Sequence, residues 1–506
     1  MDSLFTFASL QSRLMIMDTS LGLWVFTALL GGSFALFGLL KRANEWLYVS
    51  TLGDKKHSLP PGDMGWPLIG TMWSFFKAFK YGDPDSFISS FVTRYGNTGI
   101  YKALMFGSPS IIVTTPEACK LVLMDEERFG PGWPVSVTKL MGKKGLHNVT
   151  IEEHKRLLRL TAAPVRGHET LSGYLDSIKD IVIASLEELS LKEEPIEFLT
   201  EMRKVAFKLI MSVLLSGESD PRLEDMEKEY TDLNEGVIST PINLPGFAYH
   251  KALKARKKLV EIFQAVFDER IAMRKNNKSN EKRDMLHLLI EAEDVDGGKL
   301  SAEEIIDLLI IYLNAGHESS SLTAMWAVMF LEQHPQYFQK AKEEQEEIVR
   351  RRPSTEIGLS FKEIREMQYI SKVIDETLRV VSPAFVFFRE ATCDININGY
   401  TIPKGWKVLA WIRNVHLDNE YYPNPKEFNP SRWDNHKVKA GTYSPFGGGS
   451  RLCPGKDLAK LEVSVFLHYY LLNYKFERVN PGCGMVNLPI KRPTDNCLGR
   501  IKKVAP

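Results

Sequence analysis

Apolar residues recur every three or four positions through most of the chain after residue 170, and this spacing predicts helices. The expected helices are 174–215, 222–235, 249–276, 281–293, 302–333, 335–350, 361–381 and 456–473. Short runs in which apolar and polar residues alternate predict strands at 99–103, 110–114, 395–397, 401–402, 407–410 and 474–478. The pattern therefore predicts a mainly α fold with small β-sheets.

A separate hydrophobic segment lies near the N-terminus. Residues 21–40 (LGLWVFTALLGGSFALFGLL) contain no charge and are followed at once by Lys41 and Arg42. As a helix this segment spans ~30 Å, enough for the apolar core of a membrane. The basic residues after it place the rest of the chain in the cytosol. A cleavable signal peptide fits less well, because no Ala-x-Ala-like site follows.

These features predict four regions. We expect a lumenal segment at 1–20, a transmembrane anchor at 21–40, a basic stop with a proline–glycine hinge at 41–70, and a single cytosolic domain at 71–506. No repeat or long flexible linker divides the last region.

The composition does not identify a function, but it argues against several classes of protein. The 506 residues carry a net charge of +1, so charge gives no reason to expect a nucleic-acid partner. The five cysteines are widely spaced and contain no C-x-x-C pair, which argues against a disulfide framework or a zinc cluster. Four of them, Cys119, Cys393, Cys483 and Cys497, are interpreted as buried or incidental thiols.

The fifth cysteine lies in a glycine-rich loop, Phe446-Gly-Gly-Gly449-Ser-Arg451-Leu-Cys453-Pro-Gly455, just before a predicted helix. Glycines let the backbone approach a flat ligand, and the helix N-terminus favours a thiolate. A sulfur presented in this way suits haem iron as a single axial ligand. The alternative for an isolated cysteine is a buried structural thiol.

Two further patterns carry polar groups on predicted helices. In Ala315-Gly316-His317-Glu318-Ser319, a small pair would leave space above a flat cofactor, and an acid followed by an alcohol would relay protons. The alternative is a kinked helix that tolerates a few polar residues. Glu376 and Arg379 share one helix face and can pair, and Arg432 in a following Pro–Arg segment can join them as an internal clamp.

The cysteine loop resembles the haem-binding loop of the cytochrome P-450 haem-thiolate monooxygenases, whose pattern is F-x-x-G-x-R-x-C-x-G. The resemblance implies the cytochrome P-450 fold, haem b (iron protoporphyrin IX) on Cys453, and a cofactor-binding set that includes Phe446, Gly449 and Gly455. It also implies that Arg389 and Arg451 hold the haem propionates.

The resemblance extends to the catalytic machinery and its partners. It implies oxygen activation at Ala315, Gly316, Glu318 and Ser319, although the family commonly has threonine where this chain has Ser319. The implied partners are an NADPH-cytochrome reductase as electron donor and the endoplasmic reticulum membrane. Lys456 and Lys460, on the helix after the cysteine, are candidates for a basic surface that binds the reductase.

A helix near residue 154 departs from the relatives. They carry arginine four places after the histidine, whereas this chain has Leu158 there and Arg159 one place further on. Arg159 lies about 100° round the helix from the expected position, so its role at a propionate is in doubt. We assign His154, Lys155 and Arg156 to a solvated helix face.

Longer segments narrow the resemblance to the plant ent-kaurenoic acid oxidase subfamily. They include Leu59-Pro-Pro-Gly62, Phe129-Gly-Pro-Gly-Trp-Pro134, Thr161-Ala-Ala-Pro-Val165, Asn243-Leu-Pro-Gly-Phe247 and Asp495-Asn-Cys497. The departures fall in segments expected to face substrate: 145–150, where Gly145-Leu-His147-Asn-Val-Thr150 replaces a Ser-Phe-Val-Gly-Ile-Ser-like run, and also 321–322, 383–387 and 484–487.

We therefore expect a monooxygenase that oxidises a polycyclic terpenoid, with a triterpenoid such as a limonoid-type precursor preferred. Ent-kaurenoic acid oxidation in gibberellin biosynthesis is the first alternative. A reductase-independent haem-thiolate isomerase is the second, and a redox-silent haem or lipid carrier on the membrane is a third.

Overall fold

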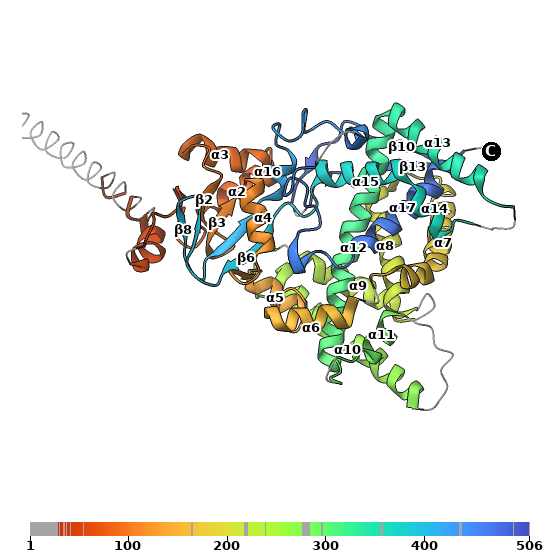
Figure 1. The fold of residues 1–506 in the computed structure, drawn as a ribbon, viewed down its shortest axis with the longest axis horizontal. Coiled ribbons are helices and arrows are strands. Elements are labelled where there is room, and N and C mark those ends of the chain that lie inside the picture. The colour runs from red at the N-terminus through yellow and green to blue at the C-terminus, as the bar shows by residue number, and fades with distance from the viewer. Residues whose placement is uncertain are drawn as a thin grey trace, which may run out of the picture.

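The computed structural model describes residues 29, 31–33, 36, 38–40, 42–53, 55–162, 165–216, 221–237, 239–275, 284–294, 297–354, 358–434, 438–488 and 490–504. Helices form most of the molecule, and the largest sheet lies at the end nearer the N-terminal segment (Figure 1). The mainly α fold with small sheets expected from the sequence is confirmed.

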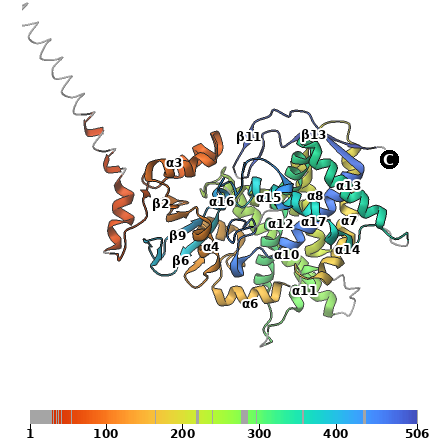
Figure 2. The ribbon, with the colours of Figure 1, turned by 45° about the horizontal axis from the view of Figure 1, so that its top comes forward.

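The helices are α2 (Met72–Phe76), α3 (Asp85–Tyr95), α4 (Pro116–Met124), α5 (Val135–Met141), α6 (Ile151–Ala162), α7 (His168–Ser190), α8 (Phe198–Leu215), α9 (Leu223–Val237), α10 (Ala248–Lys275), α11 (Met285–Glu291), α12 (Ala302–Gln333), α13 (Pro335–Arg351), α14 (Phe361–Glu366), α15 (Gln368–Val381), α16 (Ile412–His416) and α17 (Lys456–Asn473). α12 runs through the middle of the molecule, with α8, α15 and α17 packed around it (Figure 2).

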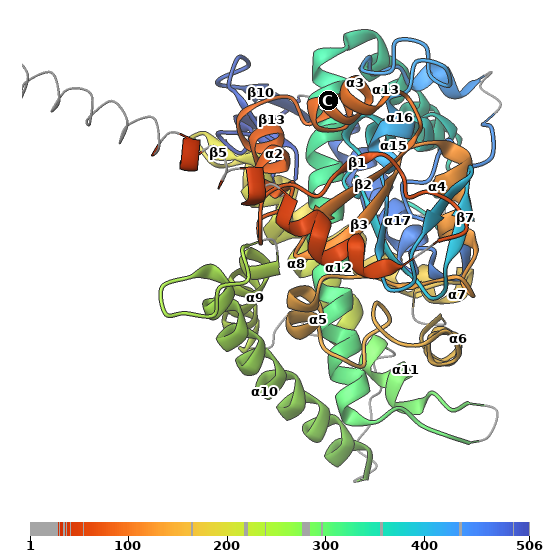
Figure 3. The same ribbon diagram turned by 90° about the vertical axis from the view of Figure 1, so that its left-hand side faces the viewer.

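The strands are β1 (Gly62–Asp63), β2 (Ile100–Met105), β3 (Ser108–Val113), β4 (Phe129–Pro131), β5 (Ile196–Glu197), β6 (Phe387–Ala391), β7 (Ile395–Ile397), β8 (Tyr400–Ile402), β9 (Lys407–Ala410), β10 (Tyr474–Arg478), β11 (Met485–Val486), β12 (Arg492–Pro493) and β13 (Leu498–Lys503). The largest sheet has the order β1-β2-β3-β9-β6-β4, and β10-β13-β5 forms a second. Both sheets therefore join strands from early and late parts of the chain. Figure 3 shows β1, β2 and β3 in front of α12.

Two of the expected helices are each divided in the structure. The span 174–215 contains α7 and α8, because residues 196–197 leave the helical path to pair with β13. The span 361–381 breaks at Met367, between α14 and α15. Glu344 of α13 fills this break, since its carboxylate accepts the backbone N–H groups of Tyr369 (2.5 Å) and Ile370 (3.0 Å) at the start of α15.

α12 begins at a capping box, in which Ser301 and Glu304 satisfy each other's backbone N–H groups. Most of its later residues are buried, which explains why the segment is apolar on nearly every face. Gly316 lies where α12 meets α8, and a Cβ at this position would be 3.0 Å from Cδ1 of Ile210. The glycine therefore allows close packing of the two helices.

The expected proline–glycine hinge packs against the large sheet. β1 pairs in parallel with β2, and the Thr71 N–H donates to the Leu104 carbonyl (3.0 Å). A Cβ on Gly70, whose φ is +62°, would lie 2.2 Å from that same carbonyl oxygen. Residues 62–71 are thus an integral part of the fold.

The expected lumenal segment at 1–20 lies outside the described residues, and so does most of the expected anchor at 21–40. Among the helices that are described, none combines the length and apolar character needed to cross a bilayer.

Candidate active site

A cavity of about 470 Å³ lies between α12 and the loop before α17. Most of the residues predicted from the sequence to bind cofactor or oxygen line it: Ala315, Gly316, Glu318, Ser319, Arg389, Phe446, Arg451, Cys453 and Gly455. The fold thus brings the helix motif, strand β6 and the cysteine loop to one place.

The thiol of Cys453 lies immediately before α17. Its backbone N–H donates to the carbonyl of Phe446 (3.0 Å), which closes the loop into a turn. Burial raises the pKa of the Cys453 thiol, whereas a hydrogen bond from the Gly455 backbone and the charge of Arg166 oppose that rise. Such backbone and cationic stabilisation is what a ligating thiolate needs.

The glycines of this loop serve different purposes. Gly449 has a φ of +70°, and a Cβ there would lie 2.5 Å from the Leu123 carbonyl oxygen. It therefore lets the loop pack against α4 and does not directly shape the cavity wall. Gly455 does line the cavity, and no atom lies within 4 Å of the position that a Cβ would take. Open space at Gly455 suits the close approach of a planar ligand.

Two arginines face the cavity without a carboxylate partner. Arg389 is buried and donates only a long bond to the Phe388 carbonyl (3.3 Å), while Arg451 donates to the carbonyls of Leu146 (3.1 Å) and Val149 (2.9 Å). Among the described residues, neither guanidinium has a carboxylate within ion-pair distance, although the charge of the more distant Glu126 acts on both. Burial lowers the pKa of Arg389 to about 10, and the charge of Arg451 adds to this effect. The pair suits an anionic ligand, which would offset both the desolvation and the repulsion.

The residues of α6 differ from the expectation. His154 is buried, and its ring nitrogens lie 3.2 Å and 3.3 Å from the carbonyl oxygens of Leu146 and Ser450. The prediction of a solvated histidine was wrong, because this ring joins the cysteine loop to the segment before α6. Arg159 is exposed, whereas Leu158 lines the cavity.

Arg156, also expected on a solvated face, binds three carboxylates. It pairs with Glu153 (2.7 Å), Glu304 (3.0 Å) and Asp294 (3.3 Å). These contacts attach α6 to the start of α12. Arg156 therefore has a structural role.

Glu318 on α12 forms a two-point ion pair with Arg203 of α8. The Arg203 Nε donates to Oε2 of Glu318 (2.9 Å), and the second contact joins Nη2 to Oε1. The Glu318 side chain is largely buried, and the hydroxyl of Ser319 donates to the Ala315 carbonyl (2.7 Å). The acid and the alcohol both reach the cavity, and each already has a hydrogen-bond partner.

His317, the residue before Glu318, packs into the core. Its ring meets that of Tyr230 edge-on at 4.7 Å, and burial lowers its pKa to about 3. The imidazole is thus neutral and acts as a packing residue.

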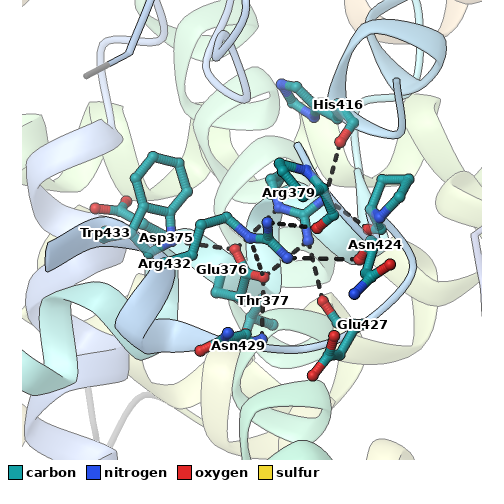
Figure 4. A network of polar contacts seen from close by, with 12 residues as sticks. Asp375, Glu376, Thr377, Arg379, His416, Asn424, Glu427, Asn429, Arg432 and Trp433 are labelled. Atoms are coloured by element: carbon teal, nitrogen blue, oxygen red, sulfur yellow. Dashed lines mark hydrogen bonds and ion pairs between the residues drawn. The ribbon is translucent and has the colours of Figure 1, made fainter. Parts of the chain in front are cut away.

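Glu376 and Arg379 form a fully buried pair on α15 (Figure 4). Arg379 donates to both carboxylate oxygens of Glu376 (2.8 Å and 2.9 Å), and Arg432 Nε donates to Oε1 (3.2 Å). Trp433 Nε1 and the Asn429 N–H also donate to this carboxylate, each at 3.1 Å. The remaining guanidinium N–H groups of Arg379 reach backbone carbonyls, including that of His416 (2.8 Å). The cluster is therefore well satisfied, as a buried charge pair requires.

His416 connects this cluster to the cysteine loop. Its Nε2 accepts the Ser444 backbone N–H (3.1 Å), and its Nδ1 lies 2.9 Å from the Ser382 hydroxyl. Burial, followed by the charge of Arg379, lowers the pKa of His416 to about 3. Burial keeps the ring neutral, so Nε2 can accept the loop N–H, and the contact between Nδ1 and the Ser382 hydroxyl favours the required tautomer.

A second connection runs through Asp375. It accepts the hydroxyl of Tyr443 (3.0 Å) and pairs with Lys460 on α17 (2.7 Å). α15 is thereby attached to the chain on both sides of Cys453.

The site and fold together define a family. The cytochrome P450 family model matches residues 60–485, and the chain belongs to that family, whose members bind haem b. The two arginines of the cavity wall, the open space at Gly455 and the thiol before α17 fit that cofactor.

Relatives from plants are similar over nearly the whole chain. The chain is 56% identical to ent-kaurenoic acid oxidase 2 of Arabidopsis thaliana, covering 97% of this chain and 100% of the relative. It is also 56% identical to a 7,8-epoxymelianol synthase of Ailanthus altissima (95% and 97%) and 52% identical to a beta-amyrin 11-oxidase of Glycyrrhiza uralensis (93% and 96%). Among solved structures, the retinoic acid-bound cyanobacterial CYP120A1 matches with a TM-score of 0.79 and 26% identity, covering 89% of this chain and 100% of that chain.

Of the segments expected to depart from the ent-kaurenoic acid oxidase pattern, some line the cavity and others do not. Leu146, His147, Pro383, Ala384 and Phe387 line the cavity. Ser321 and Leu322 are buried within α12, and residues 485–486 form β11. Two of the four departures therefore lie where a substrate would touch them.

Sequence reasoning did not identify Arg203 or His416, and it gave His147 no individual role. Arg203 is one of several basic residues on an amphipathic helix, and its partner comes from a distant helix. His416 has no local motif. Only the departure of segment 145–150 from the relatives pointed to His147.

Proposed function

We propose that the protein is a membrane-anchored, NADPH- and O2-dependent haem-thiolate monooxygenase that oxidises a polycyclic terpenoid. The main support is one observation: Cys453, the two arginines Arg389 and Arg451, and residues of the Ala315–Ser319 motif line the same cavity. When bound there, haem would supply oxygen activation for hydroxylation, epoxidation or multistep oxidation.

The protein's residues have separate tasks in this proposal. Cys453 would ligate the iron, Arg389 and Arg451 would bind the propionates, and Phe446 would contact the haem, since all four residues line the cavity. Ala315 and Gly316 leave room above the ring plane. Glu318 supplies protons through the Ser319 hydroxyl, which must first leave its bond to the Ala315 carbonyl.

Glu376, Arg379 and Arg432 hold the cysteine loop in position and take no part in proton transfer. Their contacts reach the loop through His416 and Ser444, two residues before Phe446. Rigid support of this kind fixes the distance between ligand and cofactor.

For the substrate, we prefer a triterpenoid of specialised metabolism, such as a limonoid-type precursor. Support comes from the departures at 146–147 and 383–387, which lie in the cavity wall, and from similarity to an epoxymelianol synthase and an amyrin oxidase. Ent-kaurenoic acid oxidation is the alternative, supported by 56% identity to the Arabidopsis enzyme.

We further propose that residues 21–40 anchor the enzyme in the endoplasmic reticulum membrane as a single pass, with residues 71–506 in the cytosol. The uncharged segment followed by Lys41 and Arg42 supports this topology. An NADPH-cytochrome reductase in the same membrane would donate electrons. Lys460, which pairs with Asp375, is less suited to bind it than the neighbouring Lys456.

The test is co-expression of the full chain with a plant reductase and separate feeding of ent-kaurenoic acid, tirucallane-type and oleanane-type triterpenoids. An oxygenated triterpenoid that requires NADPH is the expected product. Gibberellin A12 as the product would overturn the preferred substrate. Turnover without NADPH would overturn the monooxygenase proposal in favour of an isomerase.

A control separates chemistry from folding. The ferrous carbon monoxide complex should absorb near ~450 nm in the wild type, and Cys453→Ala should lose both this band and turnover. Wild-type absorption at ~420 nm in gently prepared membranes would contradict thiolate ligation.

A further inference from the structure

His147 lines the cavity, and its ring nitrogens are not used by any hydrogen bond among the described residues. It lies before α6, and both ring nitrogens are buried. Trp133 meets the imidazole edge-on at 6.5 Å and itself packs on Phe388. Buried polar groups in native proteins normally have partners, so one supplied by a bound molecule is expected here.

The neighbouring glycine makes room for this ring. A Cβ on Gly145 would lie 1.9 Å from Cδ1 of Ile311 on α12 and 3.0 Å from Nδ1 of His147. A side chain at 145 would require Ile311 to move and would crowd the imidazole. Gly145 and His147 both belong to segment 145–150, one of the segments that we expected to differ from the ent-kaurenoic acid oxidase pattern.

The segment carrying His147 is held at both ends. On one side, Asp307 of α12 accepts the Lys144 backbone N–H (3.1 Å) and binds Arg256 (2.6 Å). On the other, Arg451 donates to the carbonyls of Leu146 and Val149. The imidazole is therefore preorganised, and a ligand would not have to order the segment.

Other polar groups of the cavity are already engaged. The Ser319 hydroxyl donates to the Ala315 carbonyl, and Glu318 is paired with Arg203. The hydroxyl groups of Tyr312 and Ser320 are exceptions: both residues line the cavity, and neither hydroxyl has a hydrogen-bond partner among the described residues, although Thr161 and Glu462 lie nearby. Arg389 and Arg451 are assigned above to the propionates.

The protonation state of His147 selects the ligand chemistry. Burial lowers its pKa to about 4, and the charges of Arg451 and Arg256 contribute to that decrease. A neutral imidazole has one donor and one acceptor nitrogen. A hydroxyl can satisfy either nitrogen and a carbonyl can accept from the N–H, whereas a carboxylate would gain no charge pairing here.

We propose that His147 is a specificity-determining residue that binds a hydroxyl or carbonyl oxygen of the substrate. This inference rests on the proposed function only in taking the occupant of the cavity to be a terpenoid.

The test uses the full-length holoprotein and measures ligand affinity from the change in haem absorption. The probes are two pairs, each sharing one carbon skeleton: ent-kaurenol with ent-kaurene, and β-amyrin with olean-12-ene. The variants are His147→Phe, which removes both nitrogens, and His147→Gln, which keeps a donor and an acceptor. His57→Phe is the matched control, because this histidine is exposed and lies outside the cavity.

In at least one pair, the wild type should prefer the alcohol, and His147→Phe should reduce that preference about tenfold, the effect expected for one buried hydrogen bond. His147→Gln should restore part of it, and His57→Phe should leave it unchanged. A preference that stays within twofold of the wild type in both pairs would overturn the proposal. So would loss of haem from His147→Phe with an unchanged preference, because the imidazole would then contact the cofactor.

The two proposals fail separately. If the preference changes as expected but the reductase-coupled enzyme oxidises no terpenoid, the contact at His147 stands and the proposed oxidation does not.

Discussion

Glu318 lies on α12, and both of its carboxylate oxygens accept hydrogen bonds from Arg203 of α8. One of these two contacts must break before the Glu318 carboxylate can pass a proton into the cavity. The ion pair thus couples proton delivery to the position of α8.

Replacing Glu318 with glutamine should remove the proton donor while preserving its shape. We expect product formation to fall about a hundredfold, the usual contribution of general acid catalysis. NADPH consumption should fall much less, so the ratio of product to NADPH is the measurement. Glu303→Gln, at an exposed glutamate on the first turn of α12, is the control and should leave that ratio unchanged. Equal losses of product and NADPH consumption in Glu318→Gln would contradict the relay.

Leu158 leaves a gap in the set of cations around the cavity. It lines the cavity where the relatives carry arginine, so Leu158→Arg should add a third contact to the propionates. We expect haem to transfer to apomyoglobin about tenfold more slowly from this variant, since a hydrogen bond to a charged group has that effect.

Arg389→Leu should change the haem transfer rate by a similar factor in the opposite direction. Arg159→Leu, on the exposed face of α6, is the control and should have no effect. Unchanged haem transfer in both Leu158→Arg and Arg389→Leu would contradict the assignment of propionates to this side of the cavity.

At the scale of elements, α15 is the support of the cysteine loop. Arg379 of the buried Glu376–Arg379 pair donates to the backbone carbonyls of His416, Pro425 and Glu427. Asp375, the residue before Glu376, binds Tyr443 and Lys460. The loop is thus attached to one helix by both charged and neutral contacts.

Arg379→Lys should break this support, since lysine cannot form the forked contact with Glu376. Each buried hydrogen bond of Arg379 that lysine leaves unmade costs about 1–3 kcal/mol, so we expect little holoprotein in the membrane fraction. The carbon monoxide difference spectrum per amount of protein measures this. Arg365→Lys, at an exposed site on α14, should express normally, and a normal spectrum for Arg379→Lys would contradict the clamp.

The elements also show what the sequence could and could not reveal. The cysteine loop, the α12 motif and the α15 pair are each made of residues close together in the chain. Their spacing was therefore enough to mark them as candidates from the sequence alone. The division of α7 from α8 depends on pairing with β13, and the break at Met367 depends on a carboxylate from α13. Such long-range contacts leave no local pattern, and the same is true of Arg203 and His416.

At the scale of the whole molecule, buried histidines make the stability depend on pH. Burial lowers the pKa to about 3 for His317 and His416 and to about 4 for His147 and His468. These rings stay neutral in the folded state, whereas unfolding lets them bind protons below their usual pKa of about 6.5. Their contribution is therefore complete above about pH 6.5 and is lost as the pH falls towards 4.

Several carboxyls act in the opposite sense. Burial raises the pKa of Glu462 to about 7, so its contribution is complete below its usual pKa and is lost as the pH rises through 7. Burial also raises the pKa of Glu227, Glu332 and Glu344. The histidines bind protons in the unfolded chain between pH 7 and pH 5, so we expect the urea midpoint of the detergent-solubilised protein to decrease over this interval.

His317→Phe should reduce that pH dependence, because phenylalanine can keep the edge-on contact with Tyr230 while removing one titrating group. The slope should decrease by about 1.4 kcal/mol per pH unit. His57→Phe should leave it unchanged. A slope equal to that of the wild type in His317→Phe would show that the buried ring does not control the response.

The sheet topology has a consequence for biosynthesis. β4 completes its pairing only with β6, and β5 only with β13, the last strand of the chain. A ribosome that has delivered the first half of the polypeptide therefore presents strand edges whose partners have not been translated. The sheet that contains β5 and β13 therefore cannot form until the C-terminal strand has left the ribosome.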